Sequence, residues 1–353
     1  MNGLFPNSPF NLSPDSKRLF LEGMLNLLWR QWSALGVSGA VYSTDRPIID
    51  PEALLLFSTV FARYDARLFD EMLDWLLSHG NLLNMQRLGN VRKKYPRFGD
   101  DRVLAACAEL LGEKAILKKW QSVQELVEQY IGRLQVEPLF KLKTGESAPH
   151  FGSVDYRFQK YGLSRSPYVR STKSLRPLDN LPACLLVKLR ALFGVNARAE
   201  VMNYLLTHDE AHPAAIAKET YFFRKTIQDC LNEMEVSGQI RSRMPGREKQ
   251  FLLTKEWNFL YAQPSSDLVP QWIDWPALFN LLTQVWKLAG DDKWSHVDPL
   301  LLVVEQKKLT ESVSPMLLKQ IGIDGSNTVV GLNFLSNLTK GIGNNLYDGL
   351  LSD

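Results

Sequence analysis

Side chains suited to contacts with phosphates and bases are concentrated between residues 224 and 249. Near the start of the segment RKTIQDCLNEMEVSG lie Arg224, Lys225, Thr226 and Gln228. Around MPGREK lie Arg241, Arg243, Arg247 and Lys249, with Glu248 as the single acid among them. Cationic groups bind phosphate oxygens, and Arg and Gln side chains can also bind base edges. These residues are therefore candidate contacts for a nucleic acid, with a solvated surface charge as the alternative for each of them alone.

Other residues that could do chemistry give weaker signals. Cys107, Cys184 and Cys230 lie far apart without a C-x-x-C pair, which favours small core residues over a disulfide or zinc site. His208 and His212 could share a metal on one helical face, but Pro213 follows at once, so THDEAHP is interpreted as a loop. The chain has no phosphate-binding glycine motif, no H-E-x-x-H and no G-x-S-x-G. We expect neither an enzyme, nor a metal, nor a cofactor.

Three helices and a hairpin are expected to position the candidate residues. Asn196 can cap a first helix, ARAEVMNYLLTH, and Pro213 begins a short second helix, PAAIAKE. The third helix carries Ile227, Leu231 and Met234 at i, i+4 and i+7, and Gly238 ends it. The alternating segments QIRSR and QFLLT predict two strands joined by a turn at Pro245 and Gly246.

This order of elements resembles the winged helix-turn-helix family of DNA-binding regulators. The resemblance is carried by Ile216-Ala217 in helix two, Thr226-Ile227, Leu231 and Met234 in helix three, and Ser237-Gly238 before the wing, and it covers about residues 185 to 260. It implies that the third helix reads DNA while the wing contacts its backbone. The family commonly has Gly in the turn and Ser or Thr at the third cap, whereas this chain has Tyr221 and Phe223, aromatic residues that can instead pack against a neighbouring domain.

The length of 353 residues predicts two or three domains. We expect a mainly α, multi-domain chain with a helical N-terminal domain (1–140), a basic linker (141–183), a winged helix-turn-helix domain with a small β-hairpin (184–262) and a helical C-terminal region (263–353). The composition is 45% hydrophobic and 22% charged, and no apolar stretch reaches the roughly 18 residues of a membrane span. No secretory signal is recognised at the start, so we expect a cytoplasmic protein without a membrane partner.

The net charge of +3 is too small to identify a nucleic-acid partner by itself. Two further basic groups have alternative interpretations as anion contacts or as solvated surface. One is Arg87, Arg92, Lys93, Lys94 and Arg97. The other, in the linker, is Lys141, Lys143, Arg157, Lys160, Arg165, Arg170, Lys173 and Arg176.

The first hypothesis is a transcriptional regulator that binds double-stranded DNA as a homodimer. Trp-rich helices at 15–34 and 275–288 are the candidate dimer surfaces, with burial inside the monomer as the alternative. The second hypothesis is a winged-helix subunit, or an antitoxin-like partner, that binds another protein without reading DNA.

Overall fold

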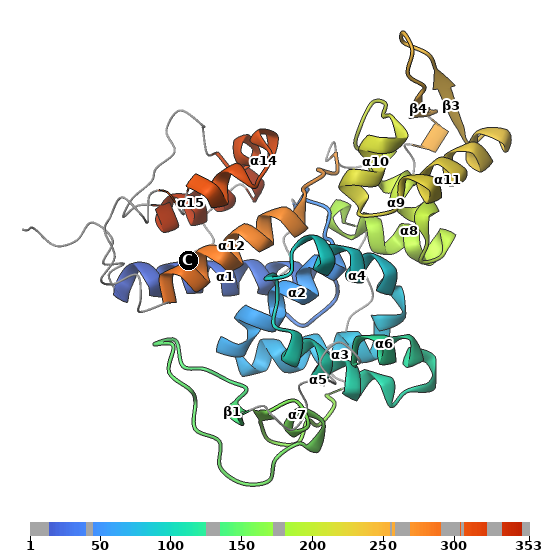
Figure 1. Cartoon of the computed structure of the whole chain (residues 1–353). Coiled ribbons are helices and arrows are strands. Elements are labelled where there is room, and N and C mark those ends of the chain that lie inside the picture. The colour runs from blue at the N-terminus through green and yellow to red at the C-terminus, as the bar shows by residue number, and fades with distance from the viewer. Residues whose placement is uncertain are drawn as a thin grey trace, which may run out of the picture.

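The structure is a computed structural model that describes residues 14–39, 45–124, 135–171, 181–254, 256–257, 269–290, 304, 307–322 and 334–347. It is mainly helical, which confirms the predicted class. In these ranges the strands form two sheets of two strands each. Figure 1 shows a helical body and, at one end of it, a smaller group of helices from which a hairpin projects.

Over residues 14–39 and 45–124, the N-terminal part of the helical body contains six helices and three short 3-10 turns. The helices are α1 (Pro14–Ala34), α2 (Pro51–Phe61), α3 (Ala66–His79), α4 (Met85–Lys94), α5 (Asp101–Gly112) and α6 (Gln121–Gln124). The 3-10 turns are η1 (Ala62–Tyr64), η2 (Gly80–Leu82) and η3 (Ala115–Trp120). Pro51 occupies the first position of α2, and α3 begins after Asp65, whose side chain accepts a hydrogen bond from the Leu68 amide.

The basic linker is laid against this body. It contains β1 (Glu137–Pro138), which pairs in parallel with β2 (Leu163–Ser164), and the single turn α7 (Tyr156–Gln159). Its cations meet acids of the helices: Arg165 lies 2.7 Å from Asp70, and Lys160 lies 2.8 Å from Glu109. These pairs favour the interpretation of the linker as a surface segment, while Lys173 and Arg176 lie outside the described residues.

The smaller group runs from α8 to β4. Its elements are η5 (Pro182–Cys184), α8 (Leu185–Phe193), α9 (Ala197–Leu205), α10 (Pro213–Thr220), α11 (Arg224–Val236), β3 (Ile240–Arg243) and β4 (Gln250–Leu253). Asn196 caps α9 by accepting from the Arg198 amide, and Gly238 has a φ of 74°, so both predicted helix boundaries are confirmed. Apolar side chains from α8, α9, α10, α11, β3 and β4 form one cluster of buried residues, whereas Ala183 and Cys184 of η5 belong to the core of the helical body.

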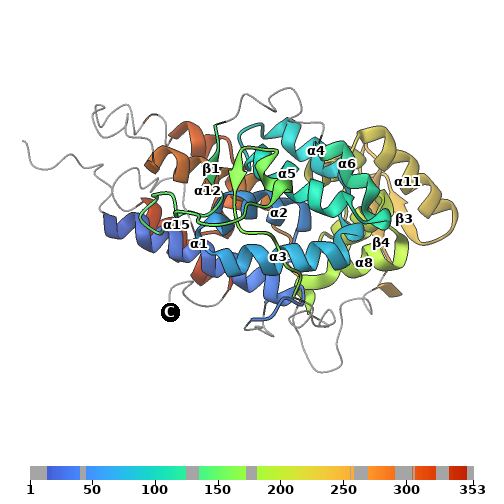
Figure 2. The same ribbon diagram turned by 90° about the horizontal axis from the view of Figure 1, so that it is seen from below.

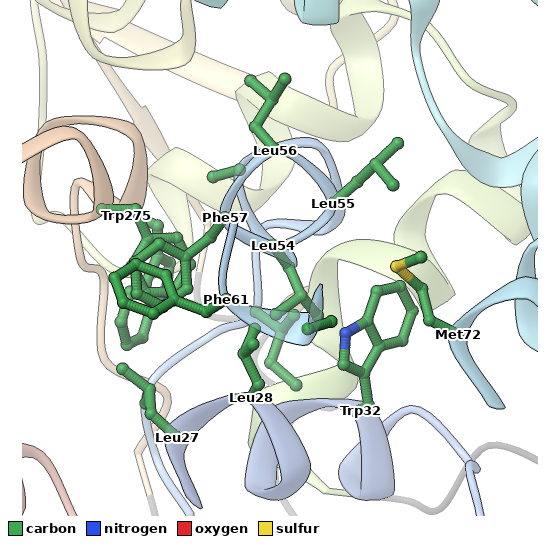
Figure 3. Close-up of a cluster of buried hydrophobic side chains, with 14 of the residues drawn as sticks. Leu27, Leu28, Trp32, Leu54, Leu55, Leu56, Phe57, Phe61, Met72 and Trp275 are labelled. Carbon is green, nitrogen blue, oxygen red and sulfur yellow. The ribbon is translucent and has the colours of Figure 1, made fainter. Parts of the chain in front are cut away.

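The C-terminal helices belong to the core of the helical body. They include α12 (Trp275–Gly290), α14 (Pro315–Gln320) and α15 (Phe334–Leu346). Figure 3 shows residues of α1, α2, α3 and α12 gathered in this core, where the rings of Phe57 and Phe279 stack at 4.2 Å. One cluster of buried side chains spans the N-terminal helices, the linker and the C-terminal helices. The domain boundaries themselves stay a prediction.

The Trp-rich helices turn most of their indole surface inward. Trp32 donates to Ser58 Oγ and Trp275 donates to the Ile48 carbonyl, and both rings are buried. Trp286 stacks on Phe20 at 6.0 Å, and Trp29 donates to Asp65. Trp32 and Trp275 are thus buried inside the monomer, whereas Trp29 and Trp286 are half-buried by neighbouring helices, and the dimer surface stays a prediction.

None of the helices within the described ranges is both long and apolar enough to cross a bilayer.

Candidate nucleic-acid interface

Helix α11 presents its polar side away from the core. Ile227, Cys230, Leu231 and Met234 are its buried residues, which fixes the rotation of the helix. Arg224 and Lys225 are consequently exposed in the first turn, and the neighbouring Thr226 and Gln228 are half-buried. The Gln228 amide donates to Asn232 at 3.1 Å on the same face.

The N-terminus of α11 differs from that of α9 in its capping. Phe223 occupies the cap position and supplies no side-chain hydrogen bond, and the first turn contains no acid. In α9, by contrast, the Asn196 side chain accepts from the first turn. The first amide groups of a helix lack partners within the helix and carry partial positive charge. An anion can therefore approach the start of α11 without displacing a cap.

The hairpin places two arginines on one face. Strand β3 pairs antiparallel with β4, with Arg241 opposite Leu252 and Arg243 opposite Gln250. Alternate residues of a strand share a face, so Arg241 and Arg243 point to the same side while Ile240 is buried. Arg247 is exposed in the connecting turn. A single antiparallel bridge between Ala211 and Phe251 ties β4 to the loop before α10.

Three of the candidate cations already have carboxylate partners. Lys225 lies 2.7 Å from Asp229, Arg243 contacts Glu210, and Lys249 contacts Glu235. The hydrogen bond from Arg243 lowers the pKa of Glu210. Solvent screens such exposed pairs strongly, so their cations can exchange a carboxylate for a phosphate at small cost.

The remaining three cations have no such partner. Among the described residues, no carboxylate lies within 4 Å of Arg224, Arg241 or Arg247. The structure thus places one arginine without a carboxylate partner at the start of α11 and two in the hairpin.

Tyr221 fixes the turn between α10 and α11 to the helical body. Its hydroxyl donates to Asp274 at 2.6 Å and lies 3.3 Å from the hydroxyl of Tyr95, while its carbonyl accepts from Asn90. Burial, the Asp274 carboxylate and Tyr95 raise the pKa of Tyr221 well above its usual value. The expectation that an aromatic residue of this turn packs against another part of the chain is confirmed for Tyr221, whereas Phe223 is exposed.

A buried ionic cluster joins the same two parts of the molecule. Arg190 on α8 lies 2.6 Å from Glu52 on α2 and 2.6 Å from Glu200 on α9. Arg87 on α4 binds Glu52 at 2.7 Å and contacts Asp50. The interpretation of Arg87 as an anion contact or a solvated residue is therefore wrong, because its guanidinium is enclosed by carboxylates of its own chain.

Sequence reasoning missed the other members of this ionic cluster. A signal was present, because Glu52 and Arg190 interrupt the strongly apolar runs PEALLLF and LLVKLRALF. Charged residues in such runs are seldom fully buried unless they are paired. The partners could not be assigned, because they come from four different helices.

The cysteines and the histidine pair have structural surroundings. All three cysteines are buried and none forms a disulfide, and burial raises the pKa of Cys107 to about 12 and that of Cys230 to about 11. His208 stacks on Tyr204 at 3.9 Å, while His212 caps α10 by accepting from the Ala214 amide. The two rings thus contact different elements. In the part of the chain that the structure describes, no three His, Cys, Asp or Glu side chains are grouped to hold a metal.

No protein-family model, curated protein or solved structure matches this chain.

Proposed function

We propose that this protein is a cytoplasmic, DNA-binding transcriptional regulator that uses residues 184–262 as a winged helix-turn-helix. The observation that carries the proposal is the presence of unpaired arginines on two elements of one small core. Arg224 lies at the start of α11, and Arg241 and Arg247 lie on the hairpin. A duplex that meets both elements would be contacted in a groove and along its backbone.

The two elements have different roles in this proposal. Arg224 and Gln228 on α11 contact base edges, while Lys225 and Thr226 contact the flanking backbone. Arg241, Arg243, Arg247 and Lys249 bind phosphates, Arg243 and Lys249 after leaving their carboxylate partners. The uncapped start of α11 adds backbone amides as phosphate donors.

The test is a comparison of two arginine variants on a panel of duplexes. Arg224→Ala should weaken binding to the preferred sequence by roughly 1–3 kcal/mol and relax the preference, whereas Arg247→Ala should weaken binding to every duplex alike. Lys143→Ala is a matched control, because Lys143 is also exposed and lies beside Glu22 on α1. Equal binding by the parent and both arginine variants would end the proposal.

A specific observation supports a second function, the binding of another protein. Three large apolar side chains are exposed on α11 and the hairpin: Phe223 is 58% exposed, Val236 90% and Met244 63%. Phe223 and Val236 lie at opposite ends of α11, so a partner protein that contacts both would lie along the length of this helix. Val236→Ser with Met244→Ser should abolish partner capture under this alternative, while DNA affinity should be unaffected if the arginines carry the function.

A homodimer remains part of the proposal. One module covers only a short half-site, and regulators of this kind gain affinity by pairing modules about a twofold axis. Light scattering at micromolar concentration, with and without DNA, measures the assembly directly. A monomer under both conditions would favour the protein-binding alternative.

A further inference from the structure

Helix α4 is fixed against the turn that precedes α11. Its Asn90 side chain donates to the Tyr221 carbonyl at 2.8 Å, and its Arg87 donates to the Thr220 carbonyl at 2.9 Å. The ammonium group of Lys94 lies over the Tyr221 ring, 4.6 Å from its centroid. These contacts hold the C-terminal end of α4 beside the start of α11 with a defined geometry.

The end of α4 and the loop after it carry cations without carboxylate partners. Lys93, Lys94 and Arg97 are exposed, and within the described ranges no carboxylate lies within 4 Å of them. Arg92 differs, because it is paired with Asp101 at 2.7 Å. Cations at the C-terminus of a helix also stabilise it by interacting with the helix dipole. This stabilisation is the alternative explanation for the presence of Lys93 and Lys94 at the end of α4.

The position of α4 relative to α11 favours a shared ligand. Figure 2 shows α4 and α11 along the same edge of the molecule, whereas α8 lies toward the opposite edge. Tyr221 precedes Arg224 by three residues, a span of at most about 11 Å. The major groove of DNA is about 12 Å wide, so phosphates that border a groove occupied by α11 lie within reach of the end of α4.

We propose that Lys93 and Lys94 of α4, with Arg97 of the loop that follows it, extend the DNA-binding surface beyond the small domain by contacting the phosphate backbone next to α11. This inference rests on the proposed function and adds a contact from the helical body. The helical body then determines how much DNA is covered and adds affinity that does not depend on sequence.

The test uses the full chain, with Lys93→Ala and Arg97→Ala made singly and together. Lys94 is left unchanged because it also packs on Tyr221. The association constant for duplex DNA is measured between low and moderate salt, alongside the thermal midpoint. Each substitution should reduce the slope of log K against log salt by about one, on all sequences alike. Lys143→Ala should leave the slope unchanged.

The outcomes separate this inference from the proposed function. If Arg247→Ala reduces the slope while the α4 variants do not, the extension is wrong and the small domain alone binds DNA. A lower thermal midpoint with an unchanged slope would likewise overturn the extension and assign the cations to the helix dipole. If neither Arg247 nor the α4 residues affect the slope, the proposed function itself fails.

Discussion

At the scale of single residues, Tyr221 connects the site to the rest of the chain. It has a φ of 62° and is the sole described residue other than glycine with a positive φ. A bulky side chain is strained in this region, so the surroundings must supply compensating contacts. The hydrogen bonds to Asp274 and Asn90 and the cations of Arg87 and Lys94 over its ring are those contacts.

Removing the Tyr221 hydroxyl should therefore cost stability. Burial raises the pKa of Asp274, and the hydrogen bond from Tyr221 acts in the opposite direction. We expect Tyr221→Phe to lower the free energy of unfolding by about 1.5–3 kcal/mol, the range for hydrogen bonds to charged groups. Urea unfolding measures this. Tyr95→Phe, which affects only the 3.3 Å contact, is the control, and an equal loss in both variants would contradict this role of Asp274.

Residues that act on their own neighbours in the chain could be predicted from the sequence. Residues that act through contacts with distant helices could not. Asn196 and Gly238 were predictable because a cap and a left-handed turn each depend on a few neighbouring atoms. The positive φ of Tyr221 was not predictable, because it depends on side chains from α4 and from the start of α12. For the same reason the sequence suggested the aromatic contact but not its partners.

At the scale of elements, acids beside the hairpin limit its positive charge. Glu210 and Glu235 contact Arg243 and Lys249, so two of the four hairpin cations are neutralised in the free protein. The sequence analysis noted only Glu248 as an acid near these residues. It missed the other two because they come from the loop before α10 and from α11.

Removing one of these acids should strengthen binding to DNA. In Glu210→Gln, Arg243 no longer has to leave a carboxylate, and a charge that repels phosphate is lost. We expect tighter binding to every duplex and a steeper salt dependence, as measured by fluorescence anisotropy. Glu22→Gln on α1, which also frees one exposed cation, Lys143, is the matched control. Unchanged affinity in Glu210→Gln would show that Arg243 does not contact phosphate.

At the scale of the whole molecule, the buried ionic cluster holds the small group of helices on the helical body. Burial by itself would raise the pKa of Glu52, but Arg190 and Arg87 lower it to about 2. For Glu200, burial raises the pKa and the arginines only partly offset it. The charge of Glu52 also raises the pKa of Glu200, and Glu200 Oε2 has no hydrogen-bond partner, although Arg87 Nε lies 3.9 Å from it.

The two acids should therefore respond differently to neutralisation. Glu52→Gln leaves two arginines without their shared partner and should cost about 3–5 kcal/mol at neutral pH. Glu200→Gln should cost clearly less, because ionised Glu200 is destabilised by burial. Thermal or urea unfolding at pH 7 compares the two variants. Equal losses of stability in both would contradict the different roles assigned to Glu52 and Glu200.

The contributions of Glu52 and Glu200 to the free energy of unfolding depend on pH with opposite signs. The folded pKa of Glu52 lies below its ordinary value of 4.5, so its contribution is present above pH 4.5 and is lost as the pH falls toward about 2. Glu52→Gln should flatten the stability profile in this window. Glu200 has a raised pKa, so its contribution is present below 4.5 and is lost as the pH rises. Glu200→Gln should remove that loss.

The most direct test of the central claim is the salt dependence of DNA binding by the full chain. The account predicts that log K falls linearly with log salt, with a slope of about −0.9 for each phosphate contact. It also predicts that Arg241→Ala and Arg247→Ala each reduce the magnitude of that slope by about one. Binding that is absent at low salt, or a slope near zero that neither variant changes, would contradict the claim that α11 and the hairpin form a DNA-binding surface.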